Sequence, residues 1–204
     1  MLSIENLSCK RGQKTLFKGV GVTLGAQGVL VLKGSNGVGK TTFLKTIAGL
    51  LRPAEGAVTF SDCDIYENLT GYHGLLHYVG HKNALKPKLT VRQNLTFWAK
   101  LRDTAELVPA ALSCFELEPY ADMQLGKLSA GWQRKVALAK LICCHSTLWI
   151  MDEPFSNLDE AAKKRLLEVI EVRANQGGII VLSSHEEIKL QQAFELNLEE
   201  FAAS

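Results

Sequence analysis

The chain has 204 residues, of which 47% are hydrophobic and 22% charged, as in an ordinary soluble domain with enough apolar residues for a packed core. The net charge of +2 excludes a strong electrostatic attraction to nucleic acid, so we expect no nucleic-acid partner. No apolar run reaches the roughly 18 residues that cross a bilayer, and the first residues show no signal peptide.

The cysteines indicate reduced thiols. Five are present, at Cys9, Cys63, Cys114, Cys143 and Cys144, and none forms a C-x-x-C pair. The adjacent Cys143 and Cys144 are open to a redox or heme-thiolate interpretation. Two small apolar residues on a buried helix are the favoured alternative.

The first part of the chain, residues 2–33, is predicted to be rich in strands. Val20, Val22 and Leu24 alternate with polar or small residues, as in a half-buried strand. The apolar run over 28–33 is typical of a buried strand.

The next stretch, residues 34–42, fits the phosphate-binding pattern G-x-x-x-x-G-K-[ST]. Its glycines permit a loop whose N–H groups point at phosphate oxygens, and a predicted helix over 42–51 adds partial positive charge. Lys40 can reach the β- and γ-phosphates, and the Thr41 hydroxyl can hold Mg²⁺. A glycine-rich turn with a chance lysine is the alternative, which the flanking strand and helix disfavour. The predicted phosphate-binding residues are Gly34, Ser35, Asn36, Gly37, Val38, Gly39, Lys40, Thr41 and Thr42.

Further strands are predicted over 56–60 and 75–79, and the pattern then becomes helical. Thr90 and Gln93 fit a capping box at the start of a helix. We expect one domain over residues 1–204 with a helical subdomain over about 85–145, in which further helices cover about 104–116 and 129–144.

After the helical block, strands and helices alternate. The pattern predicts strands over 147–151 and 178–183 and helices over 160–174 and 185–193. This alternation is typical of a parallel sheet with helical crossovers, so the fold class is α/β.

Two acids, Asp152 and Glu153, end the predicted strand over 147–151. In a phosphate-loop fold this strand end lies beside the loop, so Asp152 can hold Mg²⁺ and Glu153 can act as general base. Two acids that merely end a strand in solvent are the alternative.

A second motif begins with Leu128 and continues with Ser129, Ala130 and Gly131. Ser129 is a suitable N-cap, and the small residues after it expose backbone amides to which an anion can bind. Taken alone, this segment is equally an ordinary capped helix.

Together these motifs, with Ser-Asn-Leu-Asp at 156–159 and His185, resemble the ATP-binding-cassette ATPases. The resemblance implies a phosphate-loop NTPase fold with a mostly parallel sheet, an N-terminal antiparallel part and a helical subdomain. In that family two subunits sandwich two ATP molecules, so Ser129 and Gly131 would bind the γ-phosphate held by the partner. His185 would contact the γ-phosphate in its own subunit, although it could equally cap the predicted helix over 185–193.

Departures from the general family pattern narrow the resemblance. His81 stands where glutamine is usual, Arg11 where an aromatic residue lies under adenine, and Trp132 where glutamine is common. The short chain, the pattern G-H-x-x-x-L-K over 80–86, the segment 89–95 that follows it, and L-S-A-G together resemble the ATP-binding subunits of the heme exporter of cytochrome c biogenesis. A neutral His81 can take part in binding Mg²⁺, and Arg11 can stack on adenine or point to solvent.

The resemblance implies a homodimeric ATPase that uses ATP and Mg²⁺ on the cytoplasmic face of the bacterial inner membrane. Its partners would be integral membrane subunits of a heme-handling complex, in which hydrolysis drives heme export or release of a heme-loaded chaperone. The histidines His73, His77, His81 and His145 are assigned surface or core roles, so no direct heme binding is expected. The alternatives are an ATPase for another transported substrate, a soluble cassette acting on ribosomes or DNA, and a module that binds ATP without hydrolysing it.

Overall fold

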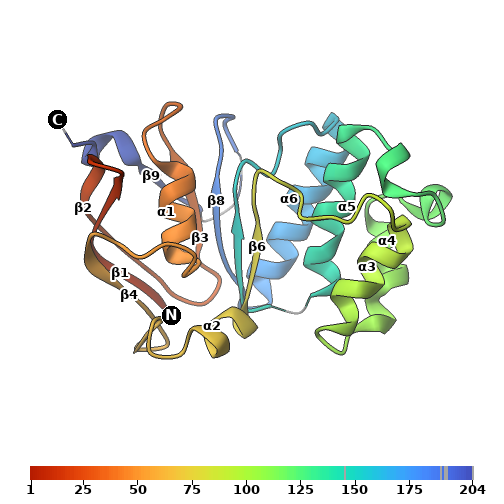
Figure 1. The fold of residues 1–204 in the computed structure, drawn as a ribbon, viewed down its shortest axis with the longest axis horizontal. Helices are drawn as coiled ribbons and strands as arrows, with labels where there is room; N and C mark the ends of the chain where they lie inside the picture. Colours follow the sequence, from red (N-terminus) through yellow and green to blue (C-terminus); the bar gives the residue numbers. More distant parts are fainter. Residues whose placement is uncertain (145, 189, 191–192, 204) are drawn as a thin grey trace. The chain divides into compact units, whose positions relative to one another are not determined.

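The computed structural model describes residues 1–144, 146–188, 190 and 193–203 (Figure 1). These residues form two compact units, which are described separately. The first unit comprises the described residues within 1–78, 147–153 and 171–204. The second unit comprises the described residues within 79–146 and 154–170. Within the described residues, no helix has both the length and the apolar character needed to cross a membrane.

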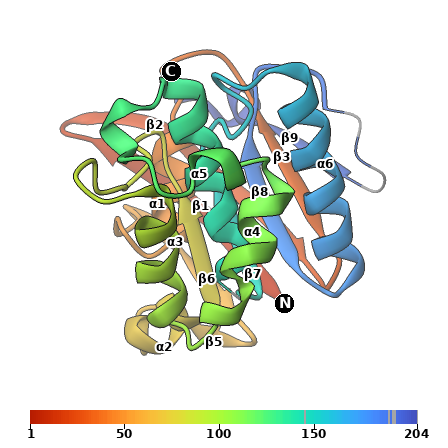
Figure 2. The ribbon, with the colours of Figure 1, turned by 90° about the vertical axis from the view of Figure 1, so that its right-hand side faces the viewer.

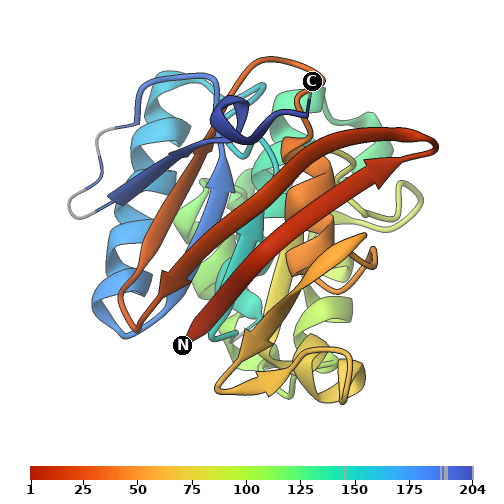
Figure 3. The same cartoon turned by 90° about the vertical axis from the view of Figure 1, so that its left-hand side faces the viewer.

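The first unit contains an antiparallel sheet whose strand order is β2-β1-β4-β5. A turn at Gly12, with φ of +62°, joins the two long strands that are red in Figure 3. Gly56 allows the close approach of β1 and β4, because a Cβ atom there would lie 2.4 Å from a backbone oxygen of Asn6. The strands are β1 (Leu2–Arg11), β2 (Lys14–Leu24), β4 (Glu55–Phe60) and β5 (Cys63–Asp64).

A five-stranded sheet has the order β6-β7-β8-β3-β9. The pairings of β7 with β8, β8 with β3, and β3 with β9 are parallel, so these strands end at one edge of the sheet. Its strands are β3 (Val29–Lys33), β6 (Leu76–Val79), β7 (Leu148–Met151), β8 (Ile179–Ser183) and β9 (Ala193–Asn197). Both β7 and β8 are buried throughout, as expected of inner parallel strands. The α/β prediction is confirmed.

The core of the first unit holds helix α1 (Lys40–Ile47) against the strands. Phe43 on α1 and Phe17 on β2 are both fully buried, and their ring centroids lie 5.9 Å apart. Burying such side chains contributes roughly 1.5–3 kcal/mol each. This packing fixes the helix that follows the phosphate loop. The helix begins two residues before the predicted 42–51 and ends at Ile47.

The second unit is built from helices (Figure 2). Helices α3, α4 and α5 pack on one another. The capping box is confirmed, since Gln93 N–H donates to Thr90 Oγ1 at 3.1 Å and Thr90 N–H donates to Gln93 Oε1 at 2.9 Å. The helices are α3 (Val91–Lys100), α4 (Val108–Cys114), α5 (Ala130–Cys143) and the first part of α6 (Glu160–Asn175), with short 3₁₀ helices at Ala105–Leu107, Glu118–Tyr120 and Leu125–Lys127.

One prediction of secondary structure is wrong, and one helix was not predicted. The helix over 185–193 is absent from its described residues, and residue 193 begins β9 instead. Ser184 Oγ accepts from Glu186 N–H at 3.0 Å and so closes a turn in place of a helical start. The helix α2 (Leu69–Leu75) was missed, because Gly71 and Gly74 weaken its helical pattern.

All five cysteines are free thiols. Cys143 ends α5 and Cys144 follows as its C-cap, and both side chains are buried. Burial raises the pKa of Cys143 to about 12, which keeps the thiol protonated. These features agree with two small apolar residues on a buried helix rather than a redox pair.

Candidate functional site

The phosphate loop joins β3 to α1 in the first unit. Gly34, Gly37 and Gly39 have φ values of +130°, +89° and +120°, which L side chains rarely adopt. The N-cap of α1 is Gly39, and no side chain caps this helix start. The first amides of α1 are therefore available to an anion, as at other phosphate-binding helix starts.

Close packing is a second reason why two of these positions require glycine. A Cβ atom at Gly34 would lie 2.9 Å from Val38 Cγ1, and one at Gly39 would lie 3.0 Å from Phe17 Cδ1. The loop tip over 35–37 is exposed. The loop is thus supported from beneath by apolar side chains and open at its tip.

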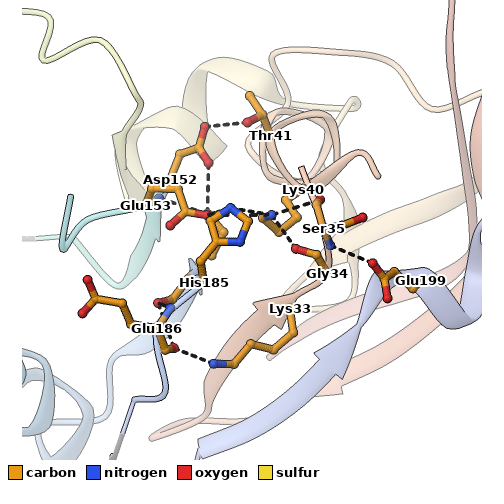
Figure 4. A network of polar contacts seen from close by, with 12 residues as sticks. Lys33, Gly34, Ser35, Lys40, Thr41, Asp152, Glu153, His185, Glu186 and Glu199 are labelled. Atoms are coloured by element: carbon orange, nitrogen blue, oxygen red, sulfur yellow. Dashed lines mark hydrogen bonds and ion pairs between the residues drawn. The ribbon is translucent and has the colours of Figure 1, made fainter. Parts of the chain in front are cut away.

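Lys40, the first residue of α1, is buried and lies at the centre of a polar network (Figure 4). Its Nζ donates to Gly34 O at 2.7 Å and to Ser35 O at 3.3 Å. The same Nζ lies 3.1 Å from His185 Nε2 and 3.9 Å from Glu153 Oε1. The ammonium group is therefore held between the loop carbonyls and the two side chains predicted to act on the γ-phosphate.

Asp152 follows β7 and is buried. Its Oδ2 accepts from Thr41 Oγ1 at 2.8 Å, and its Oδ1 accepts from Ser183 Oγ at 3.0 Å. These hydroxyl groups fix the orientation of the carboxylate. The parallel strands β7 and β8 place Asp152 and Ser183 at the same sheet edge as the loop.

Glu153 has an unusual backbone conformation. Its φ of +46° lies in the left-handed region, which costs about 1–3 kcal/mol for a residue other than glycine. Its N–H donates to Ser183 Oγ at 2.9 Å, which helps to hold this conformation. The side chain meets His185, whose Nε2 lies 3.2 Å from Glu153 Oε1.

His185 follows β8 on the turn that Ser184 closes. Lys33 Nζ donates to Glu186 O at 2.6 Å, which ties this turn to the end of β3. The side chain of His185 is 43% exposed, so it reaches Glu153 and Lys40 from the open side of the network. Residues 185–188 are not helical, so the alternative in which His185 caps a helix has no helix there to cap.

Burial and charge shift two pKa values around this network. Burial lowers the pKa of Lys40 below its ordinary value, while the charges of Glu153 and Asp152 act in the opposite direction. Burial, assisted by the negative charge of Asp152, raises the pKa of Tyr78 to about 12. Tyr78 is therefore neutral at ordinary pH.

The residues around Asp152 fit Mg²⁺. Thr41 and Asp152 offer a hydroxyl and a carboxylate at hydrogen-bonding distance from one another, and both are hard oxygen ligands of the kind that Mg²⁺ prefers. The described residues contain no group of three or more His, Cys, Asp or Glu side chains that could hold a metal ion. One or two protein ligands, with phosphate oxygens and water, are the usual set for this ion.

In the second unit, α5 begins at the L-S-A-G motif. Ser129 is the N-cap, and its Oγ accepts from Trp132 N–H at 3.5 Å. A Cβ atom at Gly131 would lie 2.9 Å from Asn157 O, so only glycine permits this approach. Lys135 Nζ lies 2.8 Å from Asp159 Oδ2, which joins the motif helix to the segment 156–159.

Trp132 packs away from the hydrogen-bonded cap. Its ring lies 4.3 Å from that of Tyr120 between centroids, and Lys135 Nζ lies 4.4 Å from the centre of the Trp132 ring system. These contacts account for the side chain within its own unit, so the backbone amides of the motif remain the candidate ligands.

His81 and Arg11 take no part in the network of the first unit. His81 is an exposed residue of the second unit, in a segment held by Arg134, whose Nη1 donates to Gly80 O at 3.0 Å. Arg11 ends β1, is exposed, and pairs in register with Lys14. Their roles beside Mg²⁺ and adenine stay predictions.

The histidines weighed as heme ligands have other surroundings. His73 Nε2 lies 3.0 Å from Ala48 O, and His77 is buried. His145 lies outside the described residues.

Sequence reasoning missed two residues of the network, Ser183 and Glu199. Ser183 ends a predicted strand of the parallel sheet, so its position at the carboxyl edge was a usable signal. Glu199 lies 164 residues after Ser35, whose N–H donates to Glu199 Oε1 at 2.9 Å, and no sequence pattern indicates this contact.

Comparisons with known proteins agree with this geometry. Residues 17–156 match the model of the ABC transporter family. A protein from Wolbachia pipientis wMel named "Cytochrome c biogenesis ATP-binding export protein CcmA" is 43% identical over 185 residues, covering 91% of this chain and 89% of the relative. A protein of the same name from Paramagnetospirillum magneticum is 42% identical over 207 residues, covering 99% and 95%.

A solved structure, a putative ABC transporter ATP-binding protein from Pyrococcus furiosus, superposes with a TM-score of 0.87 at 27% identity and covers 99% of each chain. The match of fold extends over both units, and the match of sequence over most of the chain. The chain belongs to the ABC transporter family of ATP-binding cassettes and, within it, to the CcmA group of cytochrome c biogenesis ATP-binding export proteins.

Proposed function

We propose that this chain is the ATP-hydrolysing subunit of a membrane complex for cytochrome c biogenesis. The main support for ATP hydrolysis is the contact of Lys40 Nζ with His185 Nε2 at 3.1 Å, beside Glu153 Oε1. The names of the curated relatives support the assignment to cytochrome c biogenesis. The substrate is ATP, and Mg²⁺ is the metal that fits Thr41 and Asp152.

The residues of the first unit divide the work of binding and hydrolysis. The loop amides and Lys40 bind the phosphates of ATP, which places the γ-phosphate near Glu153 and His185. Thr41 and Asp152 would hold Mg²⁺, which neutralises phosphate charge when bound. Glu153 accepts a proton from the attacking water as this water bonds to the γ-phosphorus. The bond from that phosphorus to the β–γ bridging oxygen breaks, and ADP and phosphate leave.

His185 is positioned for contact with the γ-phosphate. Its ring is partly exposed and has Nε2 between Lys40 Nζ and Glu153 Oε1. It can therefore respond to the presence of the γ-phosphate by exchanging these contacts for a phosphate oxygen. We assign it this role in its own subunit.

The second unit contributes to ATP held by another copy of the chain. Ser129 and Gly131 present the first amides of α5, and we assign them to the γ-phosphate bound by the partner. This arrangement requires a homodimer. We place His81 near Mg²⁺ in the role of the usual glutamine, and we leave Arg11 with the two roles of stacking on adenine or facing solvent.

The membrane-spanning part of the complex is assigned to other chains. We place the dimer on the cytoplasmic face of the bacterial inner membrane, against integral subunits of a heme-handling complex. Hydrolysis then drives heme export or the release of a heme-loaded chaperone by these partners. No residue of this chain is assigned to heme.

Affinity purification of the tagged chain from detergent-solubilised membranes tests this proposal. We expect heme-handling membrane subunits to copurify. Recovery of ribosomes instead would overturn the membrane assignment. Recovery of membrane subunits that handle another substrate would retain the ATPase and refute the link to heme.

A further inference from the structure

The start of the phosphate loop is hydrogen-bonded to the carboxylate of Glu199. Glu199 lies on the 3₁₀ helix η4 (Leu198–Phe201), directly after β9. Its Oε1 accepts from Ser35 N–H at 2.9 Å, as Figure 4 shows. Hydrogen bonding from Ser35 lowers the pKa of Glu199 below its ordinary value, which favours the ionised carboxylate. Glu199 has no part in the ATP chemistry described above.

The position of Glu199 is determined by the strand before it. β9 pairs in parallel with β3, and Asn197 lies opposite Lys33 at the end of that pairing. Asn197 Oδ1 accepts from Glu199 N–H at 3.1 Å and caps η4. Leu198 between them is fully buried. The sheet register, the cap and the buried leucine together place the Glu199 side chain at the loop.

The residues after η4 contact the other end of the same loop through β2. Ala203 N–H donates to Leu16 O at 3.2 Å, and Ala202 forms an isolated antiparallel bridge with Phe17. Leu16 and Phe17 are the residues that pack beneath Gly39. The segment 193–203 therefore supports both the start and the end of the phosphate loop.

We propose that Glu199 is a positioning residue for ATP binding, which holds the start of the phosphate loop through its hydrogen bond to Ser35. This proposal rests on the proposed function as an ATPase. The carbonyls of Gly34 and Ser35 are the groups that hold Lys40 Nζ. Fixing the amide of Ser35 thus fixes the peptide groups that orient the phosphate-binding ammonium group.

The negative charge of Glu199 and its hydrogen bond to Ser35 should affect ATP binding in opposite directions. A carboxylate beside a phosphate site repels an anionic ligand, so removal of its charge alone should leave binding unchanged or slightly tighter. Removal of the hydrogen bond should weaken binding, because the loop start is then free to move. The two effects have opposite directions and can be measured with different substitutions at one position.

The experiment measures ATP affinity of the purified full chain in the presence of Mg²⁺ by isothermal titration calorimetry. Glu199→Ala, which removes the acceptor, should bind ATP about fivefold more weakly. Glu199→Asp, which keeps the charge but shortens the reach, should also bind more weakly. Glu199→Gln, which keeps an acceptor oxygen without the charge, should remain within about twofold of the wild type.

Glu200→Ala is the matched control. Glu200 is the next residue on η4 and carries the same charge, and no hydrogen bond or ion pair of its side chain is found within the described part of the chain. Its replacement should leave the affinity unchanged. Thermal melting of each variant checks that the fold persists, and Lys40→Ala reports the loss of phosphate binding itself.

Equal affinity of Glu199→Ala and the wild type would overturn the proposal, as would a Glu199→Gln variant as weak as Glu199→Ala. In either case wild-type binding would persist and only the role of Glu199 would fall. A wild-type chain that fails to bind ATP would instead refute the proposed function, and with it this proposal.

Discussion

Helices α1 and α5 both begin at a glycine-containing motif, but their starts are built differently. The start of α1 has no side-chain cap, and its first residue, Lys40, turns back to the carbonyl of Gly34. The start of α5 is capped by Ser129, and Gly131 in its first turn lies against the carbonyl of Asn157. The start of α1 therefore carries a cation, Lys40, whereas the start of α5 packs against the backbone of Asn157.

The cations of α5 point into its own unit. Lys140 is buried and its Nζ donates to Asn83 O at 3.1 Å, and Arg134 is held by Gly80 O and Asn83 Oδ1. The start of α1 therefore concentrates amides, a cation and carboxylates in one place, whereas the start of α5 offers amides alone. In the homodimer that we propose, the two helix starts would therefore supply unequal shares of the phosphate site.

The largest predicted effect concerns Glu153, to which we assign the role of general base beside the start of α1. Glu153→Gln should lower ATP turnover by about 10²–10⁴-fold, because the amide cannot accept the proton from water. ATP binding should persist, since the phosphates are held by the loop and Lys40. Phosphate release and calorimetric ATP binding measure the two quantities separately. Turnover that survives the substitution would remove Glu153 from the role of general base.

The next prediction tests whether α1 depends on its own cation. Lys40→Ala should weaken ATP binding by roughly 10–100-fold, because hydrogen bonds to charged groups contribute about 1.5–3 kcal/mol. The matched change on α5, Lys135→Ala, should leave ATP affinity of the isolated subunit unchanged, because Lys135 pairs with Asp159 in the second unit. Titration calorimetry of both variants makes the comparison. Equal losses would contradict the division between the two helix starts.

The buried cation Lys140 of α5 should make folding stability depend on pH. Burial lowers its pKa in the folded chain from 10.5 to about 8, so the unfolded chain holds this proton to higher pH. The contribution of Lys140 to folding stability should therefore rise as the pH increases from about 8 towards 10.5, by on the order of 3 kcal/mol at most. Below about pH 8 the cost of burying the charge is fully present.

Urea unfolding at several pH values measures this contribution as the difference between wild type and Lys140→Met. The methionine variant should show a flatter rise of unfolding free energy over that range, because the titrating group is gone. Lys82→Met, at an exposed position, serves as the control with an unchanged slope. Parallel curves for wild type and Lys140→Met would refute a lowered pKa at Lys140.

The smallest predicted effect comes from Gly131→Ala, which tests whether the start of α5 acts in the partner's ATP site. Gly131→Ala places a Cβ atom 2.9 Å from Asn157 O, so the helix start or the segment 156–159 must shift. Turnover should fall about tenfold, the equivalent of roughly 1.4 kcal/mol, while ATP affinity of the isolated subunit stays unchanged. Steady-state kinetics with direct binding checks this split. A loss of ATP affinity in the isolated subunit would show that the α5 start acts in its own subunit.

Local sequence patterns determined the elements that carry these sites. The glycine spacing of 34–39 predicts the loop, because glycine adopts positive φ without the steric cost that a Cβ atom brings. The capping box at Thr90 depends on residues three positions apart, and the acids at Asp152 and Glu153 follow a recognisable apolar strand. Each of these predictions needs only neighbours along the chain.

Tertiary structure decided the rest. The contacts of Ser183 with Asp152 and of Glu199 with Ser35 join residues 31 and 164 positions apart. They depend on strand order and register, which the hydrophobic pattern of a single strand does not specify. The helix predicted over 185–193 was wrong for a different reason: the Ser184 hydroxyl closes a turn with Glu186 N–H, and residue 193 at its far end already belongs to β9. The chain alone thus determined the residues that can bind phosphate, and only the fold decided which distant side chains hold them in place.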